Sequence, residues 1–60
     1  MPENKDMIHL HLMEYLYETH QWGTLRWDGV LGFCLGYYGK ITDDHIWAVK
    51  ELEKSGAVIK

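Results

Sequence analysis

The chain has 60 residues and a net charge of −3, which is enough length for one small domain and gives no basic field of the kind that attracts phosphate groups. A domain of this size buries only about 60% of the surface that its unfolded chain exposes, so oligomerisation or a bound partner is the expected source of added stability. The single cysteine, Cys34, excludes an internal disulfide, and no spacing of cysteine and histidine matches a zinc site.

The start of the chain and its longest uncharged run indicate where the protein resides. Residues 1–6 are polar and do not have the apolar segment of a signal peptide. The longest uncharged run, residues 29–39, is well below the ~20 residues that a membrane-spanning helix needs. We therefore expect a cytoplasmic protein that does not enter membranes, with residues 1–4 as a flexible tail.

Residues 5–20 are predicted to form the first helix, and its charge is acidic. Within residues 1–20, Lys5 stands against four carboxylates, whereas residues 21–60 carry five basic and five acidic side chains. One face has the helical spacing of a core stripe, with Ile8, Leu12, Tyr15 and Leu16. The opposite face is also apolar, with Leu10, Met13 and Tyr17. This second face is expected either to lie under the N-terminal tail or to mediate self-association.

Residues 24–27 alternate and contain strand formers, so they are predicted to form a short strand. The following Asp28-Gly29 pair admits two structures: a tight turn into a hairpin, or the start of a helix over residues 28–38 that ends at Gly39. The helix is the preferred prediction, because its uncharged sequence suits a core position. Gly29, Gly32 and Gly36 would share one face of that helix and would let another backbone approach closely, inside the fold or across a dimer.

The last helix is predicted over residues 42–55. Thr42 is a suitable N-cap, Asp43 and Asp44 complement the positive end of the helix dipole, and Gly56 closes the helix. The face expected to be buried contains His45, Ala48, Val49 and Leu52. Residues 57–60 form a short strand that is expected to pair with residues 24–27.

The predicted order is therefore helix, strand, helix, helix, strand, which gives an α+β fold that is mostly helical. The sequence "AVKELEKSGAVIK" at residues 48–60, the Leu35-Gly36 turn signal before it and the short strand after the first helix resemble a winged helix-turn-helix domain. The resemblance implies one domain over residues 1–60 with a truncated wing, because no second wing strand follows Lys60. In that family the exposed face of the third helix enters the major groove of DNA.

The outer face of the predicted third helix admits two functions. It combines a tryptophan with mixed charges: Trp47, Asp43, Asp44, Lys50, Glu51 and Lys54. Tryptophan is enriched at interface hot spots, so Trp47 is predicted to be exposed and to anchor a protein partner, whereas Trp22 and Trp27 are expected to fill the core. The resemblance implies the alternative, a dimer that binds DNA through Lys40, Trp47, Lys50, Lys54 and Lys60. Because groove readers depend on basic and amide side chains, the three carboxylates favour the protein partner.

Metal binding and catalysis have weaker support. His11, Glu14 and Glu18 share one face of the first helix, but one helix rarely supplies a complete ligand set, and a solvated polar stripe is the simpler interpretation. Cys34 has no assigned cationic neighbour that would activate its thiol. The spacing of the glycines matches neither the P-loop nor the glycine-rich loop of dinucleotide-binding folds. The sequence therefore predicts no catalytic residue, no metal and no cofactor.

Taken together, these features predict a small non-enzymatic module that binds a protein partner or self-associates. A dimeric DNA-binding transcriptional regulator is the alternative. The compact, acidic and aromatic-rich composition also resembles that of small inhibitors encoded by phages and mobile elements. No small-molecule substrate is predicted.

Overall fold

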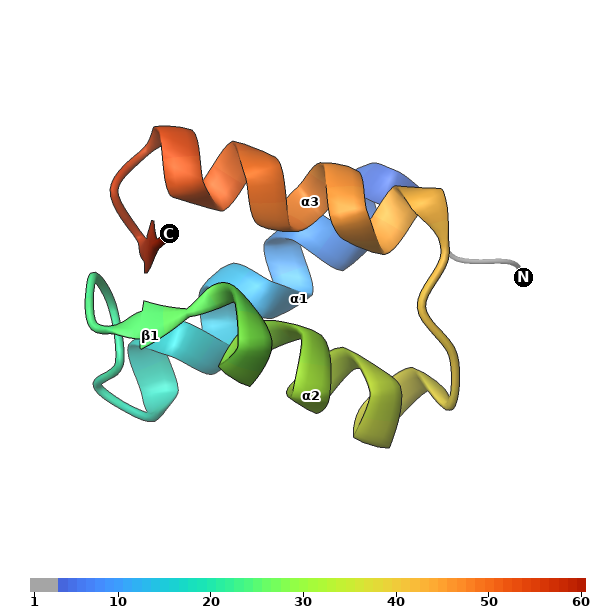
Figure 1. The fold of residues 1–60 in the computed structure, drawn as a ribbon, viewed down its shortest axis with the longest axis horizontal. Helices are drawn as coiled ribbons and strands as arrows, with labels where there is room; N and C mark the ends of the chain where they lie inside the picture. Colours follow the sequence, from blue (N-terminus) through green and yellow to red (C-terminus); the bar gives the residue numbers. More distant parts are fainter. Residues whose placement is uncertain (1–3) are drawn as a thin grey trace.

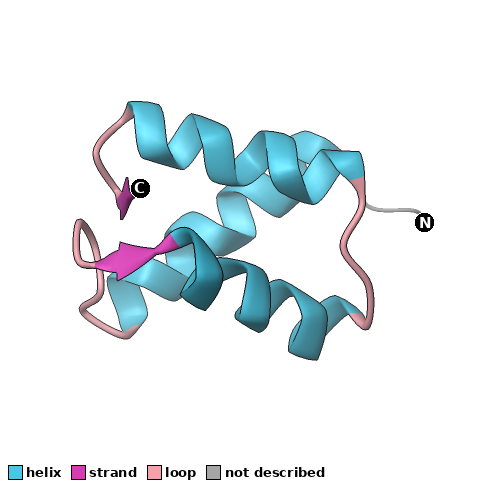
Figure 2. Cartoon of the chain, viewed as in Figure 1, coloured by secondary structure: helices cyan, strands magenta, loops and turns pink. Residues whose placement is uncertain are grey.

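The computed structural model describes residues 4–60 and contains three helices and two short strands in the predicted order. The elements are α1 (Lys5–Glu18), β1 (Leu25–Arg26), α2 (Trp27–Tyr38), α3 (Asp43–Lys54) and β2 (Val58–Ile59). The hairpin alternative for residues 28–38 is wrong, because that segment is helical. Figure 1 shows α2 and α3 in front, with α1 crossing behind them, and Figure 2 shows both strands at one end of the molecule.

Helix α1 begins with a side-chain cap. The Asn4 carboxamide oxygen accepts a hydrogen bond from the Met7 amide at 2.9 Å, so Asn4 belongs to the helix cap and not to a flexible tail. The rest of the predicted tail, residues 1–3, lies outside the described residues. The helix ends two residues earlier than predicted, because His20 takes a left-handed φ of 58° and the Gln21 amide donates to the Leu16 carbonyl at 2.9 Å.

Helix α2 ends at Gly39, whose φ of 82° places it in the left-handed region and whose amide donates to the Leu35 carbonyl at 3.0 Å. Only the first of the three helix glycines has a close neighbour. A Cβ atom at Gly29 would lie 2.6 Å from Leu25 Cδ1, whereas nothing lies within 4 Å of a Cβ at Gly32 or Gly36. The nearest atoms to a Cβ at Gly29 belong to the Leu25 side chain and not to another backbone, so the predicted close approach of a second backbone is not found there. Inside the fold that prediction is wrong for Gly32 and Gly36, which face outward.

Helix α3 begins after Thr42, as predicted, and its first turn is fastened by His45. The Thr42 amide donates to His45 Nδ1 at 3.0 Å, and the Thr42 hydroxyl lies 2.9 Å from the same nitrogen. His45 is only 4% exposed, so this contact joins the start of the helix to the core.

We expect Thr42→Ala to lower the free energy of unfolding by about 1 kcal/mol, because it removes the hydroxyl that meets His45 at the N-cap. Urea unfolding followed by circular dichroism measures the change. Thr42→Ser is the matched control, since it keeps the hydroxyl and should retain most of the stability. Equal losses in both variants would show that the hydroxyl contributes nothing.

The two strands pair in parallel, with Leu25 opposite Val58 and Arg26 opposite Ile59. The predicted pairing of the two segments is confirmed, over fewer residues than expected. A further bond of 2.7 Å from the Gly23 amide to the Ala57 carbonyl extends this contact. Because α2 and α3 lie between β1 and β2 in sequence, the strand pair ties the end of α3 to the start of α2.

The core lies between the three helices and the strand pair. Its fully or almost fully buried apolar residues are Ile8, Leu12, Leu16, Val30, Cys34, Ala48, Val49, Leu52, Ala57 and Val58. The buried face predicted for α3 is confirmed, and so is the packing of Trp22 and Trp27 against the core. In α1 the predicted stripe is buried except at Tyr15, which is half-buried. Within residues 4–60, none of the helices has the length and apolar character needed to cross a membrane.

Candidate functional site

Trp47 is half-buried, so the prediction that its side chain is exposed is wrong. The indole lies against the first turns of α1, with its ring centroid 6.0 Å from that of His9 and 4.8 Å from Lys5 Nζ. The helical position of Trp47 does direct its Cβ away from the α3 core stripe. The long side chain nevertheless lies against α1, which packs beside α3. Trp47 therefore contributes mainly to the α1–α3 contact.

The rest of the outer face of α3 carries charges of both signs. Asp43, Asp44 and Lys50 are exposed, and Glu51 is half-buried. Lys54 Nζ lies 3.2 Å from Glu51 Oε2, an ion pair within the helix. The other lysines assigned to the DNA alternative, Lys40 and Lys60, are exposed.

The outer face of α1 exposes large apolar side chains. The exposed fractions are 55% for Met7, 49% for Leu10 and 58% for Tyr17. Met13, predicted to join them, is half-buried and packs against the core. Tyr17 is anchored by stacking on Trp22, with ring centroids 4.4 Å apart and an interplanar angle of 12°. The apolar outer stripe therefore consists of Leu10 and Tyr17, with Met7 beside it.

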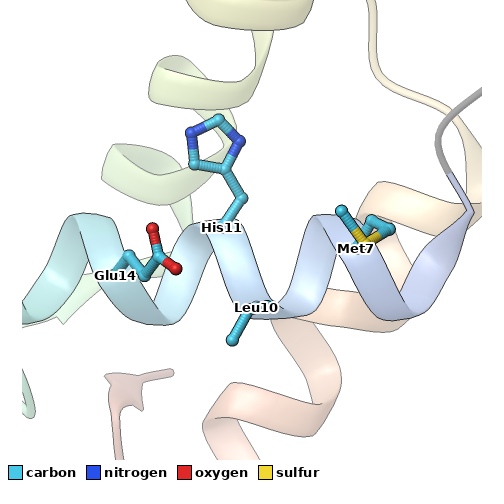
Figure 3. Close-up of a pocket in the computed structure, with 4 residues that line it drawn as sticks. All are labelled: Met7, Leu10, His11 and Glu14. Carbon is cyan, nitrogen blue, oxygen red and sulfur yellow. The ribbon is translucent and has the colours of Figure 1, made fainter.

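A shallow hollow of about 240 Å³ lies on this face, and its lining residues are Met7, Leu10, His11 and Glu14. Figure 3 shows the His11 ring directed toward α2 and Leu10 directed to the other side of the helix. The hollow therefore combines two apolar side chains with a carboxylate and an imidazole. We call it the α1 hollow.

A second hollow, of about 290 Å³, lies between α1 and α2. Its lining is acidic and aromatic: His11, Glu14, Tyr15, Glu18, Phe33 and Tyr37. Tyr15 stacks on Phe33 with centroids 3.9 Å apart, and Phe33 lies 5.5 Å from Tyr37 in a nearly parallel arrangement. We call it the acidic aromatic hollow. It shares His11 and Glu14 with the α1 hollow, so the two are continuous along the side of α1.

His11 is fixed in place by tyrosines of α2. Its Nδ1 lies 3.0 Å from the Tyr38 hydroxyl, and its ring meets that of Tyr37 edge-on at 4.5 Å. Tyr38 in turn packs its ring against His45, with centroids 4.6 Å apart. The rings of His11, Tyr38 and His45 thus connect the hollow to the first turn of α3, where His45 is buried. These contacts fix the position of His11 in the wall of the hollow.

Chemistry that would support catalysis or metal binding is sparse in the described part of the chain. Within residues 4–60, no group of three or more histidine, cysteine, aspartate or glutamate side chains is placed to hold a metal ion. His11, Glu14 and Glu18 do lie along the same hollow, as predicted for a polar stripe. Cys34 is fully buried, and burial raises the pKa of its thiol to about 11, so the thiol stays protonated near neutral pH.

The sequence did not indicate the aromatic part of this site. The sequence pattern places Tyr15 in the core stripe and indicates no role for Phe33 or Tyr37. A weak signal exists, because Phe33 and Tyr37 are four residues apart and so share one face of α2. Their meeting with Tyr15 depends on how α1 packs on α2.

Comparison with known proteins found no matching family model, no matching curated protein and no matching solved structure.

Proposed function

We propose that this protein is a small non-enzymatic interaction module that binds a protein partner, or a second copy of itself, through the outer surface of α1. The observation that carries the proposal is the exposure of Met7, Leu10 and Tyr17 on this one helix. Exposed apolar surface costs about 25 cal/mol per Å² relative to burial, and a partner that covers it recovers that free energy. The single buried thiol suits the reducing cytoplasm, where we propose that the protein acts.

Two further observations favour a protein partner over DNA. The two hollows offer concave surface beside the apolar stripe, with two glutamates that would repel phosphates. On α3, Lys54 is paired with Glu51, and Asp43 and Asp44 are the first two residues of the helix. The exposed Lys40, Lys50 and Lys60 support the alternative, a winged-helix-like dimer that binds DNA with its third helix.

The test compares association with DNA binding in the same preparation. We expect Leu10→Lys to weaken self-association by about tenfold or more, because it puts a charge at the centre of the apolar stripe. Sedimentation velocity measures self-association over a concentration series. Duplex DNA titrated at low and moderate salt measures the alternative, for which a steep salt dependence is the signature.

Leu35→Lys is the matched control. Leu35 is 54% exposed on α2, close to the value for Leu10, and the chemical change is the same. The control should associate like the wild type. Salt-dependent DNA binding would replace the proposal by the alternative. A wild-type protein that stays monomeric at all concentrations would exclude the second copy and leave a different protein as the partner.

A further inference from the structure

We propose that the acidic aromatic hollow binds an arginine side chain from a basic segment of a partner protein. This inference rests on the proposed function and specifies the chemistry of the partner. The volume of the hollow, about 290 Å³, is just below the range for small-molecule sites, which begins at about 300 Å³. It is therefore suited to one side chain.

The aromatic lining suits a flat cation. Tyr15 and Phe33 are stacked at 3.9 Å, and Tyr37, which is exposed, continues the cluster toward solvent. The faces of aromatic rings carry partial negative charge. A guanidinium group is therefore attracted to a ring face, and because it is planar it can also stack on it. The same attraction already operates elsewhere in this chain, where Lys5 lies over the Trp47 ring.

The carboxylates at the edge of the hollow form no ion pair with any residue of the described range 4–60. Glu14 and Glu18 are exposed and lie one turn apart on α1, a spacing at which like charges repel. Within residues 4–60, the one ion pair is that between Lys54 and Glu51, so neither glutamate is paired in that part of the chain. The single positive charge of an arginine would reduce the repulsion between the two glutamates, and its five N–H donors can reach both carboxylates better than an ammonium group can.

Charge favours a basic segment over a second copy at this hollow. Glu14 and Glu18 line it, and both are exposed. A twofold dimer through the hollow would bring the two glutamates of both copies together. A basic segment avoids that repulsion. Because the α1 hollow adjoins the acidic aromatic hollow, an apolar residue next to the arginine would lie against Met7 and Leu10.

The inference is tested by nuclear magnetic resonance titration with a short capped peptide that contains one arginine between a leucine and serines. Peptides with citrulline or lysine in place of the arginine serve as probes of charge and of shape. We expect the arginine peptide to shift the ring resonances of Tyr15, Phe33 and Tyr37. We expect Glu14→Gln combined with Glu18→Gln to weaken its binding by about tenfold. Tyr37→Leu should weaken it too, while keeping an apolar side chain at that position.

The control variant combines Asp28→Asn with Asp44→Asn. It removes the same number of charges from exposed first-turn positions of α2 and α3, outside the hollow, and should bind like the wild type. Equal binding of the citrulline or lysine peptide, equal weakening in the control, or no shifts at the hollow would each overturn the inference. None of these outcomes decides the proposed function, because self-association and DNA binding are measured without the peptides.

Discussion

Between about pH 8 and about pH 10.5, the free energy of unfolding of the wild-type protein is expected to fall by about 2 kcal/mol more than that of a Cys34→Ala variant. Cys34 is fully buried, and the cost of placing a thiolate among apolar side chains raises its pKa from 9.0 to about 11. The folded protein therefore holds the thiol proton more tightly than the unfolded chain does. The stability that Cys34 contributes is complete below about pH 9 and is lost as the pH rises toward about 11.

The size of the effect follows from the shift. One pKa unit corresponds to about 1.4 kcal/mol, so a shift from 9.0 to about 11 limits the loss to about 3 kcal/mol. For a domain of 60 residues this is a large share of the free energy of unfolding.

The measurement is urea unfolding at a series of pH values, followed by tryptophan fluorescence. Tyrosines and lysines also titrate in this window, so the quantity of interest is the difference between the wild type and Cys34→Ala at each pH. The loss of the sulfur atom changes the free energy of unfolding by the same amount at every pH. The change of the difference with pH therefore reports the titration of the thiol. Parallel stability curves would show that the thiol does not titrate differently in the two states.

The parts of the fold that could be predicted from the sequence are those that periodicity and capping determine locally. In α1, Ile8, Leu12 and Leu16 recur at the helical period and are all buried. In α3, the Thr42 cap and the buried Ala48 and Leu52 follow from the same local rules. Helix length was less predictable, because the end of α1 depends on the left-handed His20 and not on a glycine.

The failures concern side chains whose neighbours come from another element. The helical period gives the direction of the Trp47 Cβ but not the path of its indole, which lies against Lys5 and His9 of α1. The acidic aromatic hollow likewise depends on α1 meeting α2, which brings Tyr15 onto Phe33. Local pattern contains no information on that crossing. It predicts the glutamates as a polar stripe and Tyr15 as a core residue, and it indicates no role for Phe33 or Tyr37.

The glycines of α2 are expected to respond to the same substitution with opposite signs. Gly32→Ala and Gly36→Ala should each stabilise the protein by about 1 kcal/mol, because alanine restricts the unfolded chain and nothing lies within 4 Å of the new methyl groups. Gly29→Ala should destabilise it by about 1 kcal/mol. There the methyl group would lie 2.6 Å from Leu25 Cδ1 and 2.9 Å from Cγ, and the strain exceeds the gain in helix propensity.

Thermal and urea unfolding of the three single variants measure these changes, and a double-mutant cycle isolates the cause at Gly29. Leu25→Ala removes the atoms that the new methyl group would meet, so Gly29→Ala should no longer destabilise in that background. If the cost persists, it arises from the backbone and not from the contact. If Gly32→Ala and Gly36→Ala destabilise the protein, another backbone must approach this face, which would assign self-association to α2. Stabilisation by both would instead leave the outer surface of α1 as the interaction surface, since the α2 glycines would then have no packing role.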